Sequence, residues 1–150
     1  MSSKETPIIL KLKKVLLSTK TFEKRLTIIY NVTSSLMGHI FAQKNEKLPK
    51  GLLYACVVHI IEVMQISNNI MHPFLIMKKN EYTTYHHSVN VAFMSSFLGK
   101  ELHYNHTELI KLTYAALLHD IGKIRVDNTI LEKPASLDHD EFESIKHHTI

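Results

Sequence analysis

The sequence predicts an all-α protein, and three observations support this prediction. The chain has 150 residues but only four glycines and four prolines, the residues that most often interrupt helices and form turns. Apolar residues recur at spacings of three and four, as amphipathic helices require. No segment alternates between apolar and polar residues for long enough to indicate a strand.

The first half of the chain predicts three helices. The third of them is apolar on most faces, so we expect it to be buried, and Pro73 should end or kink it. These helices cover residues 8–17, 21–43 and 52 to about 71, and a polar loop occupies residues 44–51.

A charged segment at residues 78–81 separates this half from three further helices. Asp138 and Glu141 form a capping box, which predicts that the last helix begins at Asp138. The expected elements are helices at residues 84–98, at 106–119 and from 138 onward, with a loop at 123–137. We therefore expect an N-terminal helical region, residues 1–76, and a second unit, residues 77–150.

The composition is that of an ordinary globular protein, with 45% apolar and 21% charged residues. The formal charge of +4 is too small to argue for a nucleic acid polymer or an anionic membrane as a partner. Cys56 is the only cysteine and lies in an apolar run, which predicts a buried thiol in a reducing compartment. Neither a signal peptide nor a membrane span is visible, so we expect a cytoplasmic protein.

Eleven histidines are the unusual feature of the composition, and His119 is followed directly by Asp120 at a predicted helix end. Gly122 frees the backbone to turn there, so both side chains can face one cation. An imidazole and a carboxylate suit a divalent transition metal such as iron or manganese. Taken alone, this pair is better interpreted as a polar helix terminus.

A second histidine pair, His86 and His87, lies on the helix that starts at residue 84. His87 shares a face with Val91, Met94 and Leu98. We expect this face to point inward, where a histidine needs a polar partner or a metal. His86 also has apolar neighbours, so periodicity alone does not decide between the two.

A third pair, His147 and His148, lies on the last helix. His148 falls beside Ile145 on the expected buried side and is the better ligand candidate, whereas His147 is expected at the surface. The remaining six histidines carry no motif and are interpreted as ordinary helix or loop residues: His39, His59, His72, His103, His106 and His139.

Four motifs in the order and spacing of one family connect these pairs. Residues 82–92 resemble the His-Ser-x-x-Val-Ala opening of the HD-GYP family, and residues 117–124 are similar to its central His-Asp signature. Residues 130–137 resemble its Ile-Leu-x-Lys-Pro-x-x-Leu loop, and the helix that carries Glu141, Ile145 and His148 follows. The resemblance covers residues 82–150.

This resemblance implies an all-α helical bundle of the HD superfamily and a metal-dependent phosphodiesterase. The family hydrolyses cyclic di-GMP, a bacterial second messenger, to the linear dinucleotide and often to GMP. Matched by motif, His87, His119, Asp120 and His148 are metal ligands, with Asp120 bridging two divalent ions, and Lys123 lies beside the scissile phosphate. Two such ions generate a hydroxide nucleophile and neutralise phosphate oxygens.

The sequence departs from the family in two respects. Some members bind a third metal through a glutamate one turn before the first histidine, where this chain has Thr83, so we expect two metals. The family's paired histidines, later aspartate and Gly-Tyr-Pro loop would follow residue 150. We therefore expect a truncated HD-GYP domain at residues 77–150, the front part of a longer active protein, that binds metal weakly and turns over little or no substrate.

Two other functions stay open at this point. A catalytically silent HD-type module could bind a partner protein, although the intact His-Asp pair and Lys123 speak against this. Another HD-superfamily phosphohydrolase could act on nucleoside phosphates, which the loop at residues 130–137 disfavours. By analogy with the family, residues 1–76 are regulatory or form a homodimer.

Overall fold

The computed structural model describes residues 21–43, 47–67, 69, 83–131 and 133–146. These residues form helices and no strand, which confirms the all-α prediction. The elements are α2 (Phe22–Ala42), α3 (Lys50–Ile66), α5 (Thr84–Glu101), α6 (His106–Leu118), the 3-10 helix η1 (Ile121–Arg125), α7 (Asn128–Leu131) and α8 (His139–Lys146).

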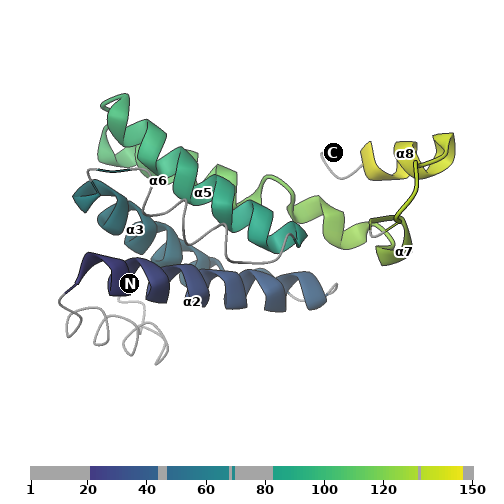
Figure 1. The fold of residues 1–150 in the computed structure, drawn as a ribbon, viewed down its shortest axis with the longest axis horizontal. Helices are drawn as coiled ribbons and strands as arrows, with labels where there is room; N and C mark the ends of the chain where they lie inside the picture. The colour runs from purple at the N-terminus through teal and green to yellow at the C-terminus, as the bar shows by residue number, and fades with distance from the viewer. Residues whose placement is uncertain (1–20, 44–46, 68, 70–82, 132, 147–150) are drawn as a thin grey trace.

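Four long helices form a bundle around one hydrophobic core. Figure 1 shows α5 and α6 along one side of the bundle and α2 and α3 along the other. Tyr30 of α2 is fully buried, and its hydroxyl donates a hydrogen bond of 2.8 Å to Oδ1 of Asn90 on α5. This bond satisfies a polar group that would otherwise be costly to bury. The core includes Leu26, Met37, Leu53, Val57, Ile60, Met64, Val89, Phe93, Leu109 and Leu117.

The shared core bears on the division into two units. Helices α2 and α3 come from the predicted N-terminal region, yet their buried side chains pack against those of α5 and α6. The boundary at residues 76 and 77 lies outside the described residues and stays a prediction. The described helices on both sides of it form one packed unit.

The third predicted helix is buried as expected, but it ends earlier than its sequence pattern predicts. Helix α3 begins at Lys50, directly after Pro49, and ends at Ile66. Ser67 has an extended backbone, and its carbonyl accepts a 2.5 Å hydrogen bond from Nζ of Lys100 on α5. This contact satisfies a carbonyl at the helix end, where intrahelical donors are missing. The helix predicted at residues 8–17 and the segment with Pro73 lie outside the described residues.

The segment predicted as a loop at residues 123–137 contains helical structure, so that prediction was partly wrong. Helix η1 continues to Arg125, and the short helix α7 follows. Oδ1 of Asp127 accepts hydrogen bonds from the backbone N–H of Thr129 at 2.9 Å and from its hydroxyl at 2.8 Å. A side chain that caps the first N–H groups in this way can start a helix turn.

Helix α8 confirms the predicted capping box. Oδ1 of Asp138 accepts from the N–H of Glu141, and Oε2 of Glu141 accepts from the N–H of Asp138, both at 2.9 Å. In Figure 1 α7 and α8 lie beyond one end of the bundle, and no described residue of α8 is buried.

A second capping box, which the sequence interpretation missed, starts α6. The side chains of Asn105 and Glu108 each accept from the other's backbone N–H, at 3.1 and 2.8 Å.

Within the part of the chain that the structure describes, no helix is long and apolar enough to cross a lipid bilayer. Cys56 is buried as predicted, and burial raises the pKa of its thiol.

Candidate metal centre

Helix α5 carries the first of the predicted ligands. Thr83 caps the helix, and its hydroxyl accepts from the backbone N–H of His86 at 3.4 Å. His87 follows within the first turn, and 56% of its side chain is exposed. The His87 side chain is therefore accessible from solvent.

The prediction that the His87 face points inward is wrong. Val91 and Met94 are half-buried, and Leu98, on the same face, is 56% exposed. The buried face of α5 instead holds small residues together with Val89 and Phe93. On this face, small side chains let α5 approach α6 closely. The small residues on this face are Ser88, Ala92, Ser96 and Gly99.

The end of α6 brings a second imidazole to the same place. His119 is the C-cap residue of α6, and its Nδ1 donates a 2.8 Å hydrogen bond to the carbonyl oxygen of Ala116. This bond assigns the proton to Nδ1 and leaves the lone pair on Nε2. Histidines that bind metals are commonly oriented by such a bond to a backbone carbonyl.

Asp120 is the centre of the cluster. Only 6% of its side chain is exposed. Oδ2 of Asp120 lies 3.4 Å from Nε2 of His119 and 4.0 Å from Nε2 of His87. The two imidazole rings meet edge to face with centroids 5.2 Å apart. Ligand atoms of all three residues lie within 4.8 Å of one another, close enough to face one metal ion.

Lys123 is held against the same carboxylate. Its Nζ lies 2.7 Å from Oδ2 of Asp120, and 24% of its side chain is exposed. The contact follows from η1, because three residues per turn place residues i and i+3 directly above one another. The sequence interpretation expected a turn freed by Gly122, but no described glycine has a positive φ angle. The chain instead tightens into a 3-10 helix.

The charges around Asp120 lower the pKa of its carboxyl group. Burial alone would raise this pKa, but the hydrogen bond and the positive charge of Lys123 outweigh burial, and His119 and His87 act in the same direction. Asp120 is therefore a carboxylate at neutral pH, as a metal ligand must be.

Three further histidines were candidate ligands. His148 and His147 are outside the described residues, so the proposed fourth ligand stays a prediction. His86 is not part of the cluster: its Nδ1 lies 3.0 Å from the hydroxyl oxygen of Thr83, and its ring packs on that of Tyr85 with centroids 4.4 Å apart.

The donor set fits a divalent transition metal. Two imidazole nitrogens and one carboxylate oxygen converge, and the buried carboxylate is negatively charged.

The contacts of Ala116 and Lys123 were not predicted. A helical carbonyl three residues before a histidine is too common to serve as a signal, but the His-Asp-x-x-Lys spacing could have indicated the lysine contact had a 3-10 turn been expected.

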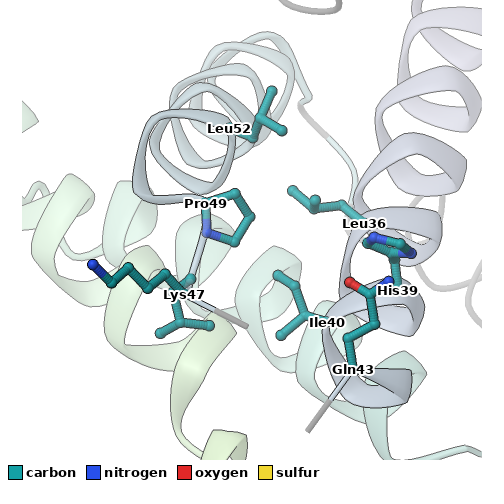
Figure 2. A pocket seen from close by; sticks show the side chains of 8 residues that line it. Leu36, His39, Ile40, Gln43, Lys47, Pro49 and Leu52 are labelled. Atoms are coloured by element: carbon teal, nitrogen blue, oxygen red, sulfur yellow. The ribbon is translucent and has the colours of Figure 1, made fainter. Parts of the chain in front are cut away.

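A separate hollow of about 170 Å³ lies between the end of α2 and the start of α3. Figure 2 shows Leu36 and Ile40 of α2 facing Pro49 and Leu52, with the imidazole of His39 at the α2 wall. The polar side chains at its margin belong to His39, Gln43 and Lys47. None of these residues belongs to the His/Asp cluster.

Comparisons with known proteins match the part of the chain that carries the cluster. Residues 84–150, which include the whole cluster, match the HD domain. This part of the chain is similar to the HD domain family. The match begins with the first residue of α5, so the three clustered residues and Lys123 all lie within the matched residues.

Curated relatives carry the resemblance further. A cyclic di-GMP phosphodiesterase of Thermotoga maritima is 32% identical over 90 residues, which are 60% of this chain and 23% of the relative. The 3'3'-cGAMP-specific phosphodiesterase 3 of Vibrio cholerae is 41% identical over 70 residues, 47% of this chain and 15% of the relative. The 3'3'-cGAMP-specific phosphodiesterase 1 of the same organism is 30% identical over 116 residues, 77% of this chain and 26% of the relative.

These similarities confirm the resemblance stated from the motifs. The chain spans between 15% and 26% of the length of these three relatives. No solved structure matches the chain.

Proposed function

We propose that this protein is a metal-dependent phosphodiesterase that hydrolyses a cyclic dinucleotide in bacterial second-messenger signalling. Cyclic di-GMP is the first candidate substrate, and the product is the linear dinucleotide or GMP. The convergence of His87, His119 and Asp120 at the end of the bundle, with Lys123 beside them, carries the proposal. These groups supply the ligands and the positive charge that phosphate ester hydrolysis requires.

Each residue has a defined part in the proposed site. His87 and His119 would hold metal through Nε2, and the carboxylate of Asp120 would be shared between the two ions. The Nδ1 bond of His119 to Ala116 fixes the direction of that imidazole. Lys123 places positive charge where the phosphate oxygens gain negative charge in the transition state. His148 is the proposed fourth ligand.

The proposed cofactor is a pair of divalent ions, iron or manganese. When bound, they supply Lewis-acid stabilisation of the phosphate oxygens and a nucleophile derived from water. Thr83 caps α5 at the position one turn before His87. A threonine there does not supply the carboxylate of a third site, so two ions remain the proposal.

The substrate is proposed as a class with two members. The names of the relatives include both cyclic di-GMP and 3'3'-cGAMP phosphodiesterases. A comparison of the two dinucleotides under identical conditions decides between them. A cytoplasmic location and a homodimer through the helices of residues 1–76 complete the proposal.

The proposed function is tested by metal binding and by single-turnover hydrolysis. The chain is loaded with Mn²⁺, and a several-fold excess of protein over cyclic di-GMP makes slow conversion to the linear product visible by chromatography. We expect both Mn²⁺ binding and conversion to depend on Asp120. If Asp120→Ala binds Mn²⁺ as tightly as the unaltered protein, the proposed centre is wrong, and the function built on it is wrong as well.

A further inference from the structure

The position of Lys123 poses a problem for any metal at this site. Among the described residues, three nitrogen atoms face Oδ2 of Asp120, and the nearest of these is Nζ of Lys123, at 2.7 Å. The Nε2 atoms of His119 and His87 lie at 3.4 and 4.0 Å from the same oxygen. The oxygen on which both imidazoles converge is thus already bonded to a cation.

Burial explains why the carboxylate holds this lysine. Only 6% of the Asp120 side chain reaches solvent, and a buried carboxylate is costly without a cationic partner. The 3-10 turn of η1 positions Lys123 one turn above Asp120 and so provides that partner.

We propose that Lys123 is an internal substitute for the metal: its ammonium group neutralises Asp120 in the metal-free protein and leaves Oδ2 when a divalent cation binds there. The inference rests on the proposed metal centre and concerns how that centre is loaded. A metal bound to a carboxylate oxygen lies roughly 2.0–2.2 Å from it. An ammonium group 2.7 Å from the same oxygen would then lie within a few ångströms of a divalent charge, where repulsion is strong.

The partly exposed position of Lys123 allows this movement. About a quarter of its side chain is accessible, and the adjacent His87 side chain is more than half exposed. The ammonium group can therefore move toward the open side of the cluster without disturbing the core. When the metal binds, it releases Lys123 from Asp120, and the lysine can then move toward an incoming phosphate. Lys123 is therefore available to a substrate only when metal is bound.

A different role for Lys123 makes the opposite prediction. If the lysine stays on Oδ2 and orients the carboxylate while the metal uses Oδ1, removal of the lysine loosens the ligand and weakens metal binding. If Lys123 competes with the metal, its removal strengthens metal binding. The sign of the change in affinity separates the two roles.

The test is the Mn²⁺ affinity of Lys123→Met, measured in the full chain by the electron paramagnetic resonance signal of free Mn²⁺. We expect the variant to bind Mn²⁺ roughly tenfold more tightly, because a competing charge beside the carboxylate is gone. Arg125→Met is the matched control: it removes one positive charge from an exposed residue of η1. Its affinity should stay within about twofold of the unaltered protein, since solvent screens an exposed charge.

Labelling of lysines in the unaltered protein gives a readout that does not depend on the folding of a variant. Acylation by an N-hydroxysuccinimide ester, followed by mass spectrometry, should be slow at Lys123 without metal and at least several-fold faster with saturating Mn²⁺. Asp120→Asn should acylate quickly at Lys123 whether or not Mn²⁺ is present.

The outcomes separate this inference from the proposed function. Unchanged or weaker Mn²⁺ binding by Lys123→Met, or equal labelling of Lys123 with and without Mn²⁺, overturns the inference while the metal centre stands. Absence of any Mn²⁺ binding that depends on Asp120 overturns the metal centre and the inference together.

Discussion

The two faces of helix α5 resemble each other in sequence but differ in the structure. One face, which we call the packed face, holds Val89 and Phe93 among small residues and is buried against the bundle. The opposite face, the open face, holds His87, Met94 and Leu98 and is partly or largely exposed. Both faces contain apolar residues, so the comparison shows that apolar periodicity does not distinguish a packing face from a face that carries a site.

The two faces should differ most in how much a substitution on each of them lowers the free energy of unfolding. Phe93 is fully buried and packs its ring against Tyr30 with centroids 5.7 Å apart. Phe93→Ala should lower the free energy of unfolding by about 3–5 kcal/mol, the usual cost of such a cavity. Leu98→Ala on the open face should change it by less than about 0.5 kcal/mol. Urea unfolding of both variants checks the comparison, and equal losses would contradict the assignment of the faces.

A larger side chain on the packed face should also lower the free energy of unfolding, but by less than the cavity at Phe93. A Cβ atom at Gly99 would lie 2.8 Å from Cδ2 of Leu109 and 2.9 Å from Cδ2 of Leu112. Gly99→Leu should therefore destabilise the protein by about 1–3 kcal/mol, although leucine is the better helix former. Ser95→Leu on the open face is the control and should be nearly neutral. A stabilised Gly99→Leu variant, measured by thermal unfolding, would show that α5 and α6 are less closely packed than described.

Substitution of His87 should separate function from stability. His87→Ala should leave the free energy of unfolding of the metal-free protein within about 0.5 kcal/mol, because the side chain is largely exposed. Its Mn²⁺ affinity should fall at least about tenfold, the loss seen when even an outer partner of a metal ligand is changed. Calorimetric titration and urea unfolding of the same preparation give both values. Wild-type affinity in His87→Ala would remove this residue from the centre.

The pH dependence of the metal-free protein should show the smallest effect. The pKa of Asp120 is lower in the folded state than in the unfolded chain, chiefly because Lys123 outweighs the opposing effect of burial. The ion pair therefore contributes its full stability above the unfolded pKa of about 3.9 and loses it as the pH falls through the lower folded pKa.

The unfolding free energy should thus fall more steeply below about pH 4 in the unaltered protein than in Asp120→Asn. Denaturant unfolding between pH 6 and pH 2 measures the two slopes. Parallel curves would mean that Asp120 has the same pKa in both states. The Glu141 carboxyl, whose pKa is lowered mainly by Lys133, contributes equally to both proteins and cancels in the comparison.

Much of the fold could be predicted from local signals. The helix start at Asp138 and Glu141 was predicted because side-chain capping is local chemistry, although the equally local capping box at Asn105 and Glu108 was missed. The end of α3 was placed too late, because Lys100, from another helix, bonds the carbonyl of Ser67 there. A contact between helices far apart in the sequence leaves no periodic signal.

The candidate site divides in the same way. The motifs brought His87, His119 and Asp120 into consideration, and the structure places their ligand atoms within 4.8 Å of one another. Motif spacing did not show that Lys123 bonds Asp120, since that contact depends on the 3-10 geometry of η1. His148 lies outside the described residues, so its place in the centre rests on the motif alone.

The central claim is that histidines of α5 and α6 bind one metal together with Asp120. Pulsed electron paramagnetic resonance of the Mn²⁺-loaded chain, with histidines labelled with ¹⁵N, measures this most directly. We predict ¹⁵N couplings of directly bound imidazoles, and these couplings should weaken in His87→Ala and in His119→Ala. In Asp120→Ala, Mn²⁺ binding should be lost, and the couplings should be lost with it. A Mn²⁺ signal without histidine coupling, or one unchanged by all three substitutions, would contradict the claim.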